Sequence, residues 1–158
     1  MNILMVCIGN ICRSPLAEGI LKDKLHKAGL NYFVDSAGMI NYHAGENPDH
    51  RSIEVGKQNG IDISKQIARQ FRKNDFENFD LIFAMDNSVY DELIFLAISP
   101  QHKSKVHLFL NFAEWNLSSE VPDPYYGTRK NFEEVFNLLN KASDNVVKKL
   151  LKKNILKM

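Results

Sequence analysis

The 158-residue sequence has few cysteines, almost no excess charge and no long apolar run. Its two cysteines, Cys7 and Cys12, cannot build the disulfide framework of a small secreted domain, so we expect a reducing, cytoplasmic location. Twenty Lys and Arg residues against nineteen Asp and Glu leave a formal charge of +1. This near-neutral balance argues against a protein that holds nucleic acid by bulk charge, and we expect no nucleic-acid partner.

Apolar runs such as residues 93–98 are far shorter than the roughly 18 residues that a membrane-spanning helix requires. The first residues also lack the positive flank of a signal peptide, so we expect no membrane span. Hydrophobic residues make up 44% of the chain and charged residues 25%, as in ordinary globular proteins. The length predicts one domain, residues 1–158, with one sizeable core.

Apolar runs and helical periodicity alternate along the chain. The runs predict buried strands at residues 2–8, 32–36, 81–85 and 106–110. Helices are predicted at residues 14–29, 48–60, 88–98 and 131–157, with short turns at 61–79 and a long loop at 111–130. This alternation predicts an α/β fold of three layers, in which helices cover both faces of a four-stranded parallel sheet. The functional site is then expected beyond the carboxyl ends of the strands.

The segment between the first strand and the first helix reads Cys-Ile-Gly-Asn-Ile-Cys-Arg-Ser, residues 7–14. A loop that curls into a helix N-terminus directs backbone N–H groups toward one point, where an anion such as phosphate binds. Gly9 and Asn10 are the residues best suited to the positive φ angles of such a curl. Arg13 adds a planar fork of donors that can hold two phosphate oxygens.

Cys7 changes this interpretation from phosphate binding to catalysis. A helix N-terminus favours the thiolate form of a cysteine, and a thiolate in a phosphate cradle is a nucleophile directed at phosphorus. Ser14, at the start of the helix, is expected either to cap that helix or to donate its hydroxyl to the Cys7 sulfur.

Displacement of an alkoxide or phenoxide also requires an acid that protonates the leaving oxygen. We predict that this acid is Asp123, which lies between two prolines in Val-Pro-Asp-Pro-Tyr-Tyr-Gly, residues 121–127. Tyr125 and Tyr126 can wall a slot for a flat ring. Asp123 would afterwards take a proton from the water that hydrolyses the phosphocysteine.

With these motifs in place, the chain resembles the low-molecular-weight protein tyrosine phosphatases. The likeness covers residues 7–18, 35–38, 48–49, 67–70, 84–86 and 123–126 in order. It implies strand order 2-1-3-4, a phosphate loop formed by Ile8, Gly9, Asn10, Ile11, Cys12 and Ser14, and the catalytic residues Cys7, Arg13 and Asp123. It also implies that Asn10 holds the loop shape with Ser36 beside it, and that Ile8, Tyr42 and Tyr125 line the substrate slot.

The implied activity is hydrolysis of phosphotyrosine in proteins, or of small aryl phosphates as an acid phosphatase does, with release of inorganic phosphate and without metal or another cofactor. One departure concerns a histidine that in many relatives supports the loop asparagine, since Gln66 stands at that position here. We expect Gln66 to keep this supporting role.

Several alternatives remain. Arsenate reductases of similar fold need cysteines downstream of Cys12, and this chain has none. Protein arginine phosphatases usually carry Thr where Ile11 stands and lack the paired tyrosines, so phosphotyrosine is favoured over phosphoarginine. A non-catalytic phosphoprotein-binding module could use the same cradle. Oxidised Cys7 could also condense with Cys12, and Asp86 is expected either to stabilise the site loops or to cap the helix that follows it.

Overall fold

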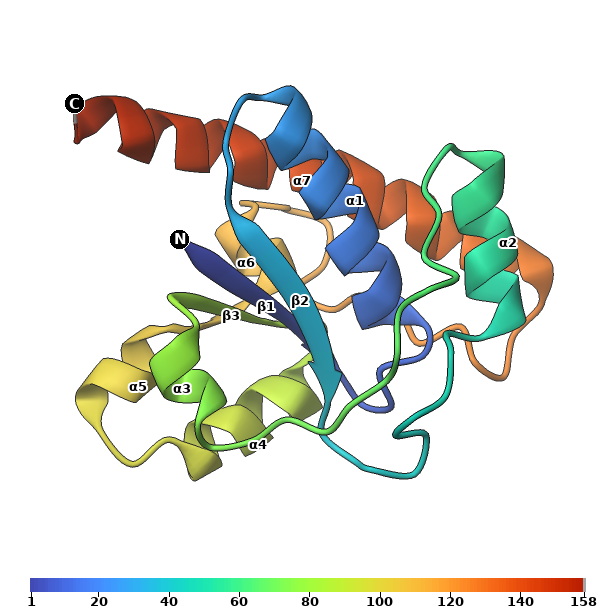
Figure 1. Ribbon diagram of the computed structural model, residues 1–158, viewed down its shortest axis with the longest axis horizontal. Helices are drawn as coiled ribbons and strands as arrows, with labels where there is room; N and C mark the ends of the chain where they lie inside the picture. The colour runs from blue at the N-terminus through green and yellow to red at the C-terminus, as the bar shows by residue number, and fades with distance from the viewer. Residues whose placement is uncertain (158) are drawn as a thin grey trace.

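The computed structural model describes residues 1–157, and its centre is a sheet of four parallel strands (Figure 1). The strands are β1 (Asn2–Cys7), β2 (Phe33–Gly38), β3 (Leu81–Ala84) and β4 (Val106–Leu108), arranged in the order β2-β1-β3-β4. The register pairs Cys7 with Gly38 at the carboxyl ends of β1 and β2. The predicted α/β class, the four parallel strands and their order are confirmed.

Helices lie on both faces of this sheet (Figure 1). One side carries α1 (Arg13–Lys27), α2 (His50–Gln58) and α7 (Arg129–Leu156), and the other carries α3 (Asp75–Asn78) and α4 (Asn87–Leu96). Two short helices flank β4, namely α5 (Pro100–Ser104) and α6 (Phe109–Phe112).

The alternation of side chains along β1 divides the core in two. Ile3 and Met5 join the cluster formed with α1 and α7, whereas Leu4 and Val6 join the cluster formed with α4. All four are fully buried, because a parallel sheet covered on both faces has no solvent side. Cys7 closes the series on the α1 face, so β1 carries the cysteine to the point where α1 begins.

The last third of the chain differs most from the prediction. The predicted strand at residues 106–110 ends at Leu108, because Phe109 and Leu110 are already helical and are buried in α6. The predicted long loop at residues 111–130 is therefore shorter at both ends. The last helix starts two residues before the predicted Asn131, whose Oδ1 accepts a hydrogen bond from Thr128 N at 2.8 Å just before the helix.

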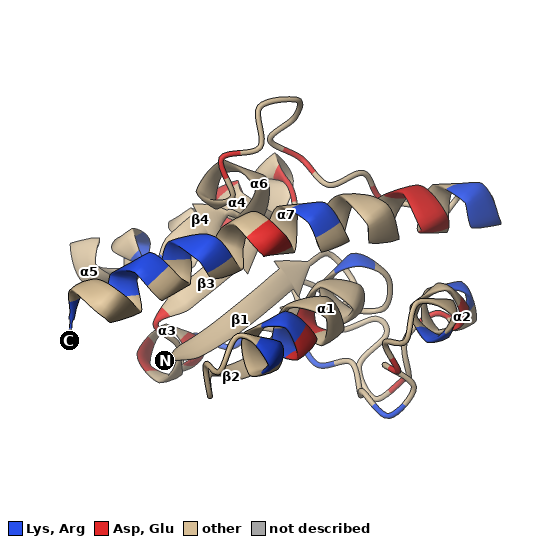
Figure 2. Cartoon of the chain, turned by 90° about the horizontal axis from the view of Figure 1, so that it is seen from above, with Lys and Arg blue, Asp and Glu red and all other residues tan. Residues whose placement is uncertain are grey.

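Charged residues mark the surface of the helices (Figure 2), and lysines recur along the C-terminal half of α7. One of these, Lys149, packs its ammonium 4.3 Å from the centre of the Phe112 ring and donates to the Phe112 carbonyl. Over residues 1–157 no helix combines the length and the apolar character needed to cross a membrane.

Candidate active site

The loop between β1 and α1 forms the base of the site. Asn10 has a φ of +59°, the left-handed conformation that asparagine tolerates better than most residues. Cys12 occupies the N-cap position of α1, and no side chain hydrogen-bonds to the first helical N–H groups. Those N–H groups and the positive end of the helix dipole are therefore available to an anion.

Cys7 lies at the end of β1 with 3% of its surface exposed. Its Sγ is 3.0 Å from Ser14 Oγ and accepts a hydrogen bond from the Asn10 backbone N at 3.3 Å. Ser14 was predicted either to cap the helix or to contact the Cys7 sulfur, and the structure shows the contact with the sulfur. Two polar groups therefore face the sulfur, an arrangement that stabilises negative charge on it.

Asn10 connects the loop to its surroundings through its side-chain amide. Its Nδ2 donates to Ser14 Oγ at 2.8 Å and to Ser36 Oγ at 2.9 Å. Its Oδ1 accepts from the Arg69 backbone N at 3.0 Å, which fixes the orientation of the amide. Every hydrogen-bonding atom of this buried side chain thus has a partner, and the curl of the loop is fixed.

Arg13 is almost fully buried and is held from two sides. Its Nη1 donates to Asp86 Oδ2 at 2.7 Å and to the Val121 carbonyl at 2.9 Å. Burial works against its charge, but Cys7 and Asp86 outweigh burial and raise the pKa of the guanidinium. Asp86 also accepts from the Val89 backbone N with its other oxygen, so it performs both of the roles between which the sequence left a choice.

Asp123 approaches from the loop of residues 121–127. Its Oδ2 lies 3.8 Å from Arg13 Nη2, and 44% of its side chain is exposed. Its Oδ1 accepts from the Tyr125 backbone N at 3.1 Å. The structure therefore brings the predicted acid beside the predicted phosphate grip, although 110 residues separate them in the sequence.

Arg51, which the sequence reasoning did not single out, tethers this loop to α2. Its guanidinium donates to the carbonyls of Tyr125 at 3.0 Å and Gly127 at 3.3 Å. It also pairs with Asp49 and lies 4.4 Å from the centre of the Phe132 ring. No local motif distinguishes this arginine from a surface residue, since its two partners in the acid loop lie 74 and 76 residues away.

A cavity of about 240 Å³ joins these groups. Its walls come from the phosphate loop, from residues 40–43 and from the acid loop, and consist of Cys7, Ile8, Gly9, Ile11, Cys12, Arg13, Ile40, His43, Asp123, Tyr125 and Tyr126. Tyr42, predicted to line the slot, is not part of this wall and is 80% exposed. Its ring instead packs edge-on against His43 at 4.8 Å.

His43 takes the wall position that was predicted for Tyr42. Its Nδ1 lies 2.8 Å from Glu46 Oε2, and its ring covers Gly9 so closely that an added Cβ at position 9 would be 3.1 Å from it. The sequence assigned His43 no functional role, because a lone histidine in a Gly- and Asn-rich segment carries no signal of its own.

Gln66 does not support Asn10 as predicted. Its Nε2 donates to the Pro15 carbonyl at 3.1 Å, so it braces the first turn of α1, and the Arg69 backbone N occupies the Asn10 oxygen instead. Gly38, at the end of β2, packs directly against the backbone of the loop. A Cβ there would come within 2.8 to 3.0 Å of backbone atoms of Ile8, Gly9 and Asn10, so only glycine allows β2 to lie so near.

The family model described as low molecular weight phosphotyrosine protein phosphatase matches residues 2–156 of this chain. The chain belongs to this family. It is similar to the low molecular weight phosphotyrosine protein phosphatase of Schizosaccharomyces pombe, with 41% identity over 154 residues that cover 95% of this chain and 97% of the relative. These matches make the chain a low molecular weight protein tyrosine phosphatase, as its motifs predict.

Solved structures of the same family agree with the fold. A protein tyrosine phosphatase from Entamoeba histolytica, crystallised with Hepes in its active site, superposes with a TM-score of 0.91 and 42% identity over 98% of this chain and 99% of that one. A Drosophila arginine phosphatase superposes with a TM-score of 0.88 and 32% identity over 95% and 98%. A protein tyrosine phosphatase and an arginine phosphatase thus share this backbone.

Proposed function

We propose that this phosphatase hydrolyses phosphotyrosine by a two-step mechanism in which Cys7, Arg13 and Asp123 act on one bound phosphoryl group. The observation that carries the proposal is the meeting of these three side chains in one cavity, in which Arg13 Nη2 lies 3.8 Å from Asp123 Oδ2. We also propose that residues 1–158 form one catalytic domain that works in the reducing cytoplasm, because a nucleophilic thiol needs such conditions.

In the first step, the Cys7 thiolate attacks phosphorus while the bond from phosphorus to the phenolic oxygen breaks. Arg13 and the N–H groups of residues 8–14 bind the equatorial oxygens and stabilise the charge of the transition state. Asp123 donates its proton to the departing phenolate, so the tyrosine side chain of the substrate leaves as a neutral phenol. Phosphorus is then bound to the sulfur.

In the second step, water attacks the phosphocysteine. Asp123, now a carboxylate, takes one proton from this water, and the bond from phosphorus to sulfur breaks. The sulfur departs as a thiolate, which the Ser14 hydroxyl and the Asn10 N–H stabilise from 3.0 and 3.3 Å. Inorganic phosphate is released and the enzyme returns to its initial state.

The walls of the cavity favour an aromatic phosphate monoester. Tyr125 and His43 lie on the cavity with their ring centres 6.2 Å apart, and Ile8 and Ile40 add apolar surface. A flat ring can pack against these apolar and aromatic groups while its phosphate reaches Cys7 at the floor. Tyrosine-phosphorylated proteins and small aryl phosphates are therefore the proposed substrates.

Phosphoarginine is the second candidate, because the Drosophila arginine phosphatase shares the fold at 32% identity. Ile11 lies in the cavity wall of this chain and offers no hydrogen bond to a guanidinium, which favours the phenolic substrate. A panel of matched peptides that carry phosphorylated Tyr, Arg or Ser distinguishes the two.

We expect the wild-type enzyme to release phosphate from the phosphotyrosine peptide and from a chromogenic aryl phosphate, with inhibition by vanadate and iodoacetate. Preference for the phosphoarginine peptide would replace the proposed substrate class. Absence of turnover on every substrate, with phosphate still bound, would favour a binding module.

A further inference from the structure

A chain of four hydrogen bonds runs from the sulfur of Cys7 to a buried carboxylate. Cys7 Sγ contacts Ser14 Oγ at 3.0 Å, and Asn10 Nδ2 donates to Ser14 Oγ at 2.8 Å and to Ser36 Oγ at 2.9 Å. Ser36 Oγ then donates to Glu18 Oε1 at 2.7 Å. The sequence analysis gave Glu18 no role beyond its place in the first helix.

The donors in this chain all have a defined direction. Because the Asn10 oxygen is occupied by the Arg69 N–H, the two amide hydrogens of Asn10 must serve the two hydroxyl groups. Ser36 passes its own hydrogen to Glu18, and the hydrogen of Ser14 is left for the sulfur. An ionised carboxylate can only accept, so it keeps Ser36 in the donating orientation. A neutral carboxyl or amide group could donate to Ser36 and reverse that bond.

Glu18 is unusual among the acidic residues of this chain. It is 8% exposed, and among residues 1–157 no Lys, Arg or His forms an ion pair with it. Burial raises the pKa of Glu18 to about 7. The nearest charges are Lys22 on the same helix, Asp35 on β2, and Arg69, which is already paired with Asp35 and Asp75.

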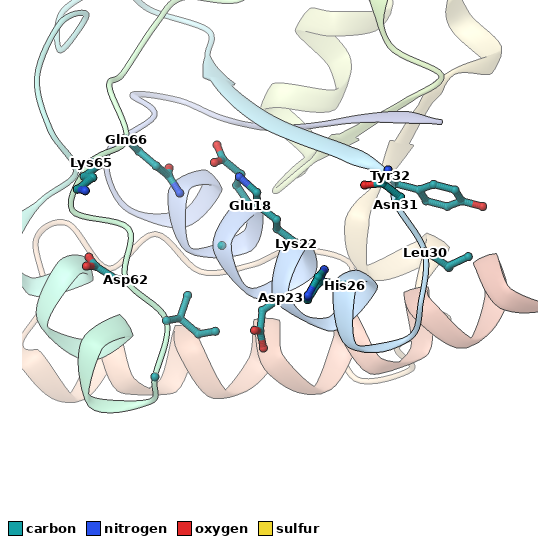
Figure 3. Close-up of a pocket in the computed structure, with 13 residues that line it drawn as sticks. Glu18, Lys22, Asp23, His26, Leu30, Asn31, Tyr32, Asp62, Lys65 and Gln66 are labelled. Carbon is teal, nitrogen blue, oxygen red and sulfur yellow. The ribbon is translucent and has the colours of Figure 1, made fainter.

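Glu18 also borders a second cavity, of about 690 Å³, between α1 and the residues at 60–66 (Figure 3). Gln66 lies beside Glu18 at one end of this cavity, and Lys22, Asp23 and His26 follow along α1. Asp62 and Lys65 complete its charged wall. The lining of this cavity shares no residue with that of the catalytic cavity, so Glu18 borders it on a side away from the reacting groups.

We propose that Glu18 is a positioning residue whose ionised carboxylate takes the Ser36 hydrogen, so that the Ser36 oxygen accepts from Asn10 Nδ2 and holds the amide that also donates to Ser14 beside Cys7. The inference rests on the function proposed above. It assigns Glu18 to the second step, in which the hydroxyl of Ser14 stabilises the sulfur as it leaves phosphorus. Protonated Glu18 can itself donate to the Ser36 oxygen and compete with Asn10 for it, so the contribution is present above about pH 7 and absent below it.

The test is Glu18→Gln, compared with Asp23→Asn as a matched change from carboxylate to amide on the same helix and the same cavity. Pre-steady-state kinetics with a chromogenic aryl phosphate separate formation of the phosphocysteine, seen as a burst, from its hydrolysis. At about pH 8 we expect Glu18→Gln to slow hydrolysis by about three- to tenfold, the effect of one weakened hydrogen bond. The burst rate should change little.

At about pH 5.5 the wild-type Glu18 is itself neutral, so Glu18→Gln should match the wild type there. Asp23→Asn should match it at both pH values. An equal loss at both pH values would show a merely structural role and overturn the proposal, as would an unchanged hydrolysis rate at about pH 8. If the wild type showed no turnover, the proposed function would fail instead.

A second variant tests the route. Ser36→Ala removes the hydroxyl through which Glu18 acts, so adding Glu18→Gln to Ser36→Ala should cause no further loss at about pH 8. If Glu18→Gln caused the same loss in the Ser36→Ala variant as it causes in the protein that retains Ser36, then Glu18 would act by another path, and the proposed chain would be overturned.

Discussion

The two loops that form the catalytic cavity are built in opposite ways. In the phosphate loop, Cys7, Asn10, Arg13 and Ser14 are buried and have hydrogen-bond partners inside the protein. In the acid loop, 44% of the Asp123 side chain is exposed, and Tyr126 is 95% exposed. The group that must bind the same anion in both steps is preorganised, whereas the group that must reach differently placed leaving oxygens is free to adjust.

The attachment of the two loops explains this difference. The phosphate loop continues directly from a central strand into a helix whose inner face is buried in the core. The acid loop is held near its ends, where Val121 N donates to the Met85 carbonyl at 2.8 Å and Arg51 binds the carbonyls of Tyr125 and Gly127. Between these points the loop is held by the Asp123–Tyr125 turn, by the bond from Gly127 N to the Pro124 carbonyl, and by the contact between Asp123 and Arg13 at 3.8 Å.

The sharpest way to test the rigid loop is Cys7→Ser. We expect turnover of an aryl phosphate to fall by about 10⁴-fold or more, because an alcohol at this position is not ionised. Phosphate binding should persist, since Arg13 and the loop N–H groups remain. Calorimetric titration with inorganic phosphate measures this, and loss of both properties would mean that Cys7 holds the loop together and is not its nucleophile.

Asp123→Asn tests the adjustable loop. We expect turnover to fall by about 100- to 10,000-fold, the usual contribution of a general acid. The loss should be largest for substrates whose leaving phenol has a high pKa, because these depend most on protonation. A series of substituted phenyl phosphates measures the dependence, and an equal loss across the series would remove Asp123 from the role of acid.

Glu18→Gln tests how the buried carboxylate that supports the rigid loop affects the stability of the fold. The folded-state pKa of Glu18, about 7, exceeds the ordinary 4.5. Between these values the unfolded chain releases a proton that the folded chain keeps, so stability falls as the pH rises from about 4.5 to about 7. The variant lacks this decline, and its stability relative to wild type should rise by about 3 kcal/mol between about pH 4 and about pH 8.

Urea unfolding of both proteins at the two pH values measures that difference. A stability gain at the higher pH together with the slower hydrolysis proposed above would mean that the buried charge is kept for catalysis at the expense of stability. Parallel stability curves would show that Glu18 has the same protonation state in the folded and unfolded chains.

The smallest effect is expected from loosening the adjustable loop. Arg51→Ala removes two hydrogen bonds to its backbone, and we expect kcat to fall by about three- to tenfold with little change in phosphate binding. Arg129→Ala is the control, because that arginine forms an exposed ion pair with Glu54 of α2, the helix that carries Arg51, whereas Arg51 binds the loop carbonyls. Equal activity of the two variants would mean that the loop needs no tether.

The sequence predicts the sheet and the rigid loop well, because both depend on local signals. Residues 81–85 form a short apolar run between polar segments, and the structure has β3 there with every residue buried. The phosphate loop combines a strand end, residues that tolerate positive φ and a helix start within eight positions. Each of these features can be recognised without knowledge of the rest of the fold.

Contacts between distant segments are what the sequence could not supply. Arg51 and His43 act on the site through residues brought near by folding, and nothing in their own neighbourhood indicates it. The resemblance implied Tyr42 for the slot where His43 lies, and the conformation of the turn that decides between these two neighbours is not visible in the sequence. Gln66 was predicted to support Asn10 because it stands where many relatives have a supporting histidine. In the structure its amide instead donates to the Pro15 carbonyl.

The course of α1 has a consequence for how this enzyme can change over evolution. The helix begins in the phosphate loop, packs through Leu16, Ile20 and Leu21 in the core, and is joined to α7 by the ion pair between Lys24 and Asp144. A substitution in this core that moves the helix as a unit also moves the N–H groups at its start. Thermal tolerance and phosphate affinity are therefore coupled at these positions, whereas residues at the rim of the cavity can vary with less effect on either.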